Sequence, residues 1–155
     1  RDTTVRNQVA RNWFMSRIGT PINHVTAKTP LRTMKIPMRW VSKMNTLVNN
    51  QDALKVFLQD KTSAGNTISL QFLDSYLYYR PEVAPEDFDV APILLTQPAQ
   101  DRWTPLALST PFLSRIQKVP VQTVMLDNAG HYPLEQPGLS QLVDQIDDFY
   151  QRVVK

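Results

Sequence analysis

The sequence predicts an α/β chain, in which a helical first part is followed by a strand-helix-strand-helix tail with parallel strands. Three observations support this fold class. Apolar residues recur at helical spacing from residue 1 to about residue 80. Two short apolar runs, at 92–97 and 121–126, have the composition of buried strands. A helical pattern follows each run, and two strands joined through a helix with a right-handed crossover lie parallel.

Composition limits the classes of protein that this chain can be. Of its 155 residues, 42% are apolar and 20% are charged, which is typical of a globular chain. The net charge of +3 comes from scattered basic residues, so we expect no nucleic-acid partner. No apolar stretch is long enough to span a membrane, and no signal pattern is present. We therefore expect a soluble protein and favour the cytoplasm.

Metal and disulfide chemistry have little to build on. The chain has no Cys, which excludes disulfides and thiolate metal sites, although this does not fix the compartment. It has two His and no H-E-x-x-H pattern, so we expect no metal site.

Residues 1–80 are expected to form several helices joined by turns that contain proline. No strand and no internal repeat is expected in this part. The last of these helices should end before Pro81, because the residue before a proline disfavours the helical conformation. The apolar faces of the expected helices are formed, in chain order, by Val5, Val9, Trp13 and Phe14; by Trp40, Val41, Met44, Leu47 and Val48; by Leu54, Phe57 and Leu58, after a cap at Asn50; and by Ile68, Phe72, Leu73, Tyr76 and Leu77.

The tail alternates between strand and helix. The strand at 92–97 lies between prolines and should be buried on both faces. A helix should follow from Pro105, or from Thr110 and Pro111, with Thr110 as its cap and Pro111 in the first helical position. The strand at 121–126 ends in turn residues from Asp127 to Gly130. The last helix carries an apolar stripe between residues 139 and 153.

Asp101 follows the first strand and His131 follows the second. Parallel strands put the loops that follow them at the same edge of the sheet, where α/β folds bind their ligands. We therefore expect Asp101 and His131 to lie side by side and to be hydrogen-bonded. A carboxylate that accepts one imidazole N–H fixes the tautomer, and the other ring nitrogen can then act as a general base.

Residues 92–153 resemble the C-terminal end of an α/β-hydrolase of the esterase or lipase kind. The matching motifs are the acid turn D-R-W-T-P, the turn N-A-G-H and the lead P-L-E-Q-P into the last helix. The resemblance implies that residues 81–155 form the C-terminal part of the hydrolase core, with residues 1–80 as a helical cap or lid. It further implies that Asp101 is the acid and His131 the histidine of a catalytic triad, acting on small or lipid-like esters without a cofactor.

The chain departs from this family in three respects: it lacks the nucleophile elbow, an H-G-G type loop for the oxyanion hole and the family's earlier strands. No G-x-S-x-G elbow is present, because the four glycines are Gly19, Gly65, Gly130 and Gly138. We therefore expect the nucleophile to lie in a missing N-terminal part, so that this chain alone is inactive. Its expected partner is that N-terminal half or a second copy. Two alternatives stay open: a hydrolase with an aspartate nucleophile, as in dehalogenases and epoxide hydrolases, or a non-catalytic binding module.

Other polar and aromatic residues are candidates for roles at the site. Asp127, rather than Asp101, could orient His131, but its position at the strand end is typical of a turn residue. Glu135 is expected to serve the start of the last helix, where negative charge is favoured. His24 is expected to be exposed in a loop flanked by prolines. The expected substrate contacts are Trp103, next to the acid, and Trp40 and Met44 in the cap; the latter two residue types at helical spacing also suit a plain core.

Overall fold

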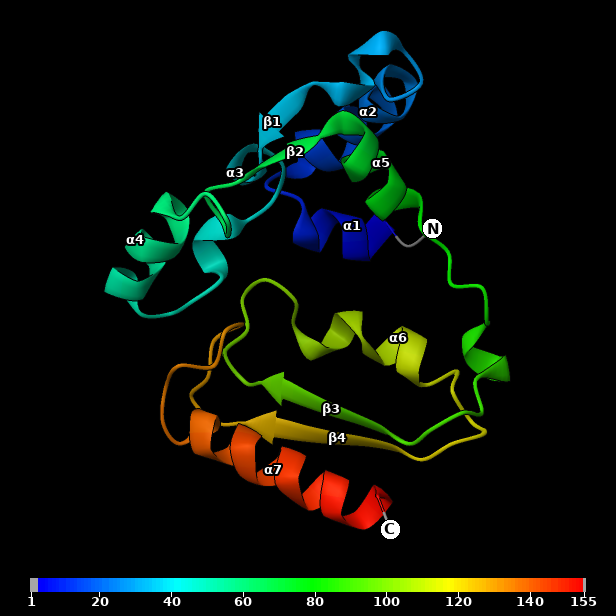
Figure 1. Ribbon diagram of the computed structural model, residues 1–155, viewed down its shortest axis with the longest axis vertical. Coiled ribbons are helices and arrows are strands. Elements are labelled where there is room, and N and C mark those ends of the chain that lie inside the picture. Colours follow the sequence, from blue (N-terminus) through cyan, green and yellow to red (C-terminus); the bar gives the residue numbers. More distant parts are fainter. Residues whose placement is uncertain (1–2, 155) are drawn as a thin grey trace. The chain divides into compact units, whose positions relative to one another are not determined.

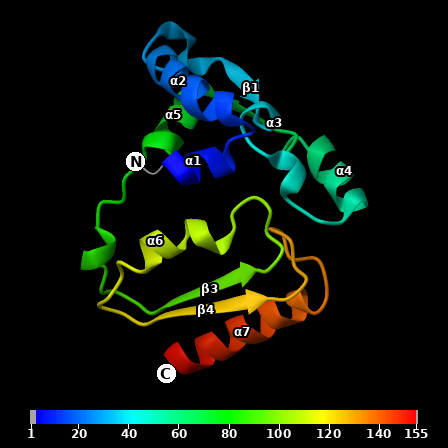
Figure 2. The same ribbon diagram turned by 180° about the vertical axis from the view of Figure 1, so that it is seen from behind.

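The computed structural model describes residues 3–154 and has a mixed α/β architecture with a small parallel sheet of two strands (Figures 1 and 2). The chain divides into two compact units. The first contains the residues up to Asn45 together with residues 51–80, and the second contains residues 46–50 together with those from Pro81 onward. In the described part of the chain, no helix is both long enough and apolar enough to cross a membrane.

The first unit consists mainly of short helices. Helix α5 shows how the sequence sets their bounds: the Ser69 hydroxyl caps its start by accepting from the backbone N–H of Phe72 at 3.1 Å. The helix ends at Tyr78, ahead of Pro81, as predicted. The helices of this unit are α1 (Thr3–Val9), a π-helix η1 (Met15–Gly19), α2 (Thr20–Thr26), a 3₁₀-helix η2 (Pro30–Thr33), α3 (Met38–Val41), α4 (Gln51–Gln59) and α5 (Leu70–Tyr78).

The prediction that residues 1–80 contain no strand was wrong. Strand β1 (Lys35–Pro37) pairs antiparallel with β2 (Thr67–Ser69), and Ile36 lies opposite Ile68. Ile68 had been assigned to the apolar face of a helix. That helix begins at Leu70, after the Ser69 cap. The β-branched residues Thr67 and Ile68 before the cap therefore keep the extended conformation that such residues favour.

The second unit contains the parallel sheet. Strand β3 (Ile93–Pro98) pairs parallel with β4 (Val121–Leu126), in the register Ile93 opposite Val121, which confirms both strands and their predicted direction. Helix α7 (Gly138–Val153) packs against both strands. In both ribbon views α6 (Thr110–Leu113) lies on the opposite side of the strand pair from α7. The remaining elements of this unit are the 3₁₀-helices η4 (Pro85–Asp87) and η5 (Leu106–Leu108), while the 3₁₀-helix η3 (Met44–Thr46) spans the boundary between the two units.

Two details of this unit differ from the expectations. The side chains of β3 are mostly only partly buried, since among the described residues β3 pairs with β4 alone. Thr110 does not cap α6. Its hydroxyl donates to the carbonyl of Leu106 at 3.0 Å, because the preceding turn, η5, already supplies that carbonyl.

Candidate active site

The loops that follow β3 and β4 are joined by backbone hydrogen bonds. The N–H of Ala99 donates to the carbonyl of Leu126, and the N–H of Gln100 donates to the carbonyl of Ala129, both at 2.9 Å. These bonds continue the parallel ladder beyond the strand ends. They bring the residues that follow, Asp101 and His131, to the same place, and Nδ1 of His131 lies 2.9 Å from Oδ2 of Asp101. The expected contact between the two side chains is therefore present.

Asp101 is held as a buried carboxylate. Its side chain is only 2% exposed. Its Oδ1 accepts from the backbone N–H groups of Trp103 and Thr104, each at 2.8 Å, and its Oδ2 accepts from the Thr104 hydroxyl at 2.8 Å and from His131. Burial opposes ionisation, but the hydrogen bonds from His131, Thr104 and Trp103 outweigh it and hold the pKa of the Asp101 carboxyl below its ordinary value. Asp101 therefore only accepts hydrogen bonds at neutral pH.

His131 is partly exposed and lies between two aromatic rings. Its side chain is 27% exposed. The ring of Trp103 makes an edge-on contact at a centroid distance of 4.7 Å, and the ring of Tyr132 makes another at 5.5 Å. Because an ionised Asp101 can only accept, Nδ1 of His131 carries the hydrogen in their bond. Among the described residues, the hydrogen bonds of the His131 ring are made by Nδ1, and none is made by Nε2.

A cavity of about 290 Å³ opens beside the pair. Its wall combines apolar side chains from the sheet and α7 with the polar groups of the two loops, which is the composition of a small-molecule site. The lining residues are Leu95, Thr96, Gln97, Pro98, Asp101, Thr104, Ser109, Leu126, His131, Pro133 and Leu142.

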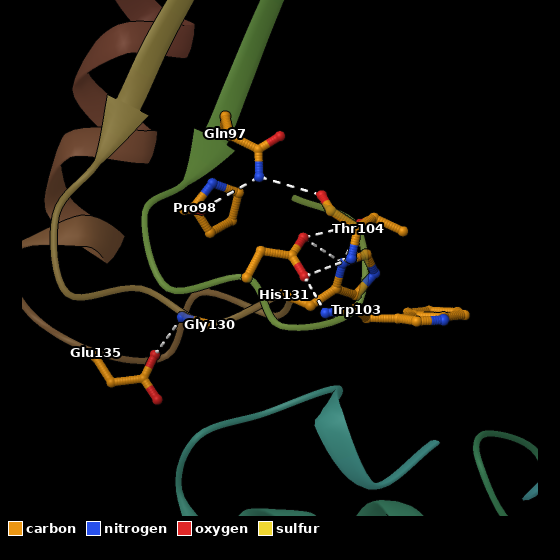
Figure 3. Close-up of polar contacts among 8 residues, drawn as sticks. Gln97, Pro98, Trp103, Thr104, Gly130, His131 and Glu135 are labelled. Atoms are coloured by element: carbon orange, nitrogen blue, oxygen red, sulfur yellow. Dashed lines mark hydrogen bonds and ion pairs between the residues drawn. The ribbon is translucent and has the colours of Figure 1, made fainter. Parts of the chain in front are cut away.

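The loop that carries His131 is braced from two sides. The Glu135 carboxylate accepts from the backbone N–H groups of Gly130 at 3.2 Å and Leu134 at 3.3 Å, and Figure 3 shows the bond to Gly130. Glu135 also serves the start of the last helix, as expected, through its backbone carbonyl, which accepts from the N–H of Leu139 at 2.9 Å. On the other side, a Cβ added at Gly130 would lie 3.0 Å from the side chain of Asn49, so glycine allows this close approach.

The rival acid is occupied elsewhere. Oδ2 of Asp127 accepts from the side-chain amide of Gln141 at 2.9 Å, and the same amide accepts from the backbone N–H of Asp127 at 2.7 Å. Asp127 is thus bonded to α7, whereas Asp101 is bonded to His131. The structure supports the choice between these two aspartates that the turn chemistry favoured.

The residues expected from the first unit have different surroundings. Met44 is a core residue with 2% of its surface exposed, whereas Trp40 is 54% exposed. Their role as substrate contacts stays a prediction. The expectation that His24 is exposed in a loop was wrong: it lies in α2, and its Nδ1 is 2.9 Å from Oδ1 of Asp74 in α5. The ring of Tyr78 covers it at a centroid distance of 4.4 Å.

Sequence reasoning missed several residues that shape the site. Thr104 contacts both members of the pair, and its spacing from Asp101, three residues on, was a usable signal because an Asp side chain often accepts from the backbone two or three residues later. Leu47 accepts from the backbone N–H of Tyr132 at 2.9 Å, and no local signal indicated that contact.

Metal ligands are not grouped anywhere between residues 3 and 154: no cluster of three or more His, Cys, Asp or Glu residues could hold an ion there. No protein-family model, curated protein or solved structure matches the chain.

Proposed function

We propose that this chain supplies the acid and the general base of a serine hydrolase that cleaves carboxylic esters. One observation supports the proposal above the others: a buried, ionised Asp101 holds Nδ1 of His131 at 2.9 Å, which leaves Nε2 as the basic nitrogen, and both residues line a cavity. The resemblance of the acid turn, the histidine turn and the lead into α7 to an α/β-hydrolase tail is independent support. The nucleophile would come from a segment outside these 155 residues, because no serine here is framed as G-x-S-x-G.

In the proposed reaction, Nε2 of His131 removes the proton from the nucleophile's hydroxyl as its oxygen attacks the ester carbonyl. Asp101 keeps the ring in the required tautomer and stabilises the positive charge that forms on it. When the tetrahedral intermediate collapses, the imidazolium donates the same proton to the leaving alcohol oxygen. A water molecule, deprotonated by Nε2 in turn, then hydrolyses the acyl ester and restores the free hydroxyl.

The apolar part of the cavity wall and Trp103 are the proposed contacts for the acyl or alcohol part of the substrate. The rings of Trp103 and His131 are in edge contact, so a group held by the indole would lie close to the basic nitrogen.

The test uses the protein in the form in which the cell makes it, with a fluorophosphonate probe that labels activated serine hydroxyls. We expect covalent labelling, loss of labelling in H131A and unchanged labelling in H24A. The H24A control is closely matched, because His24 is the other histidine of the chain and is also bonded to an aspartate.

The outcome separates the candidate functions. Labelling that survives in H131A would contradict the proposal. Hydrolysis of haloalkanes or epoxides without serine labelling would indicate an aspartate nucleophile instead. Binding of ligands with neither activity would indicate a non-catalytic module.

A further inference from the structure

The Thr104 hydroxyl lies within hydrogen-bond distance of both members of the pair, and Figure 3 shows Thr104 beside His131. Its Oγ1 is 2.8 Å from Oδ2 of Asp101 and 3.0 Å from Nδ1 of His131. A hydroxyl has one hydrogen to donate, and the ionised carboxylate can only accept. The hydrogen of Thr104 therefore goes to Asp101, and its oxygen is left to accept from His131. Nδ1–H of His131 thus has two acceptors, one on Asp101 and one on Thr104.

We propose that Thr104 is a positioning residue, whose hydroxyl locks the imidazole of His131 with its hydrogen on Nδ1 and its basic Nε2 turned away from the carboxylate. The catalytic meaning of this role rests on the proposed function, whereas the positioning itself does not. It extends the acid–histidine pair to a unit of three side chains from two loops.

The hydroxyl can position the ring because the backbone of Thr104 is itself fixed. Its N–H donates to Oδ1 of Asp101 at 2.8 Å. Its carbonyl accepts from Nε2 of Gln97 at 3.3 Å, and the same amide nitrogen donates to the carbonyl of Pro98 at 3.2 Å. Gln97 is buried at the end of β3, which explains a polar side chain in an otherwise apolar strand. The sheet thereby sets where the hydroxyl lies.

The hydroxyl also completes the set of bonds around Asp101. Two backbone N–H groups hold Oδ1, while the hydroxyl and the imidazole share Oδ2. The carboxylate then cannot rotate without losing hydrogen bonds, and one direction is left for the imidazole. Loss of the hydroxyl would free that rotation and remove the second acceptor of Nδ1–H.

The test follows the Nδ1 proton of His131 by NMR in protein labelled with ¹⁵N-histidine, and the signal that is missing from H131A identifies this ring. In T104V the exchange of this proton with water should become about fivefold faster, the change expected for the loss of one ordinary hydrogen bond. T104S, which keeps the hydroxyl, should restore the slow exchange. The amide spectrum of β3 and β4 checks that each variant is folded.

The chain contains a matched control. Thr62 donates through its backbone N–H at 2.8 Å and its hydroxyl at 2.7 Å to Oδ1 of Asp60, in an exposed turn without a histidine. T62V should leave the His131 signal unchanged. Exchange in T104V as slow as in the wild type would overturn the proposal, as would T104S behaving like T104V, because the methyl group would then be the part that matters.

A further measurement covers the case in which T104V does not fold. In the wild-type protein the hydroxyl proton of Thr104 should exchange with water more slowly than that of the exposed Thr62; equal rates would contradict the proposed role. None of these readings needs a substrate. They can therefore succeed while serine labelling fails, or fail while labelling succeeds, so the two proposals are tested separately.

Discussion

Substitution of Asp101 by Asn should reverse the tautomer of His131, and the orientation of the new amide can be worked out from the structure. Oδ1 of Asp101 accepts from two backbone N–H groups at 2.8 Å each. An amide NH₂ placed there would leave both buried donors without an acceptor, at a cost of about 1–3 kcal/mol for each. Even the low end, about 2 kcal/mol in total, favours the other orientation by roughly 30-fold.

In the favoured orientation the NH₂ group replaces Oδ2, which lies 2.9 Å from Nδ1 of His131. The amide then donates to Nδ1, so the ring hydrogen moves to Nε2 and the ring can no longer remove a proton from the nucleophile. We expect D101N to lower turnover by a factor on the order of 10⁴, the size of effect seen when a triad histidine is held in the wrong tautomer. H131A should have the larger effect and lower turnover by a factor on the order of 10⁶ relative to the wild type.

The assay is hydrolysis of a chromogenic short-chain ester by the protein in its cellular form, combined with the ¹⁵N spectrum of the ring. D127N is the matched control, since Asp127 also lies in a loop that follows a strand of the sheet but is bonded to Gln141. Its turnover should stay near that of the wild type. A D101N protein that keeps its hydrogen on Nδ1, or that hydrolyses esters as fast as D127N, would refute this reasoning.

Three further predictions concern stability. A Cβ added at Gly138 would lie 2.6 Å from a backbone oxygen, so G138A should lower the free energy of unfolding by about 1–3 kcal/mol in denaturant titrations. The control G19A should not lower it, because the nearest atom to a Cβ there is the sulfur of the flexible Met15 side chain, at 3.2 Å. Equal losses in the two variants would count against the packing seen at α7. Because folding lowers the pKa of Asp101 below its ordinary 3.8, its contribution to stability is present above that pH and is lost as the pH falls through the lower, folded value. D101N should therefore flatten the acid side of the curve of unfolding free energy against pH. An unchanged slope would show that the pKa of Asp101 is not lowered by folding. E135A should destabilise the histidine loop, because the backbone N–H groups of Gly130 and Leu134 lose their acceptor, while E135Q should keep most of the stability. A lower urea midpoint for E135Q than for E135A would contradict this role of the carboxylate.

Local pattern was enough to predict the framework of the site. Strands β3 and β4 are short apolar runs between turn residues, and their parallel direction follows from the handedness of the connection between them. The meeting of Asp101 and His131 follows from that direction alone, without any knowledge of packing. The apolar stripe of α7 likewise depends only on spacing along the chain, which a helix converts directly into a face.

Other features depended on contacts between distant segments. The pairing of Ile68 with Ile36, 32 positions away, was not predicted, because single residues near a helix start fit either the helical or the extended state. The five residues 46–50 belong with the second unit because Leu47 bonds to the backbone of Tyr132, and neither residue carries a local mark of that pairing.

The features of the site also divide into those that the local sequence determines and those that tertiary contacts determine. The sequence by itself determined which acid and which histidine meet, because strand direction and loop position are properties of the local pattern. Only the tertiary structure decided how they are held: which carboxylate oxygen faces the ring, where the Thr104 hydroxyl lies and what Glu135 bonds to. Hydrogen-bond partners depend on distances of a few ångströms between loops, and such distances are set by packing rather than by the order of residues.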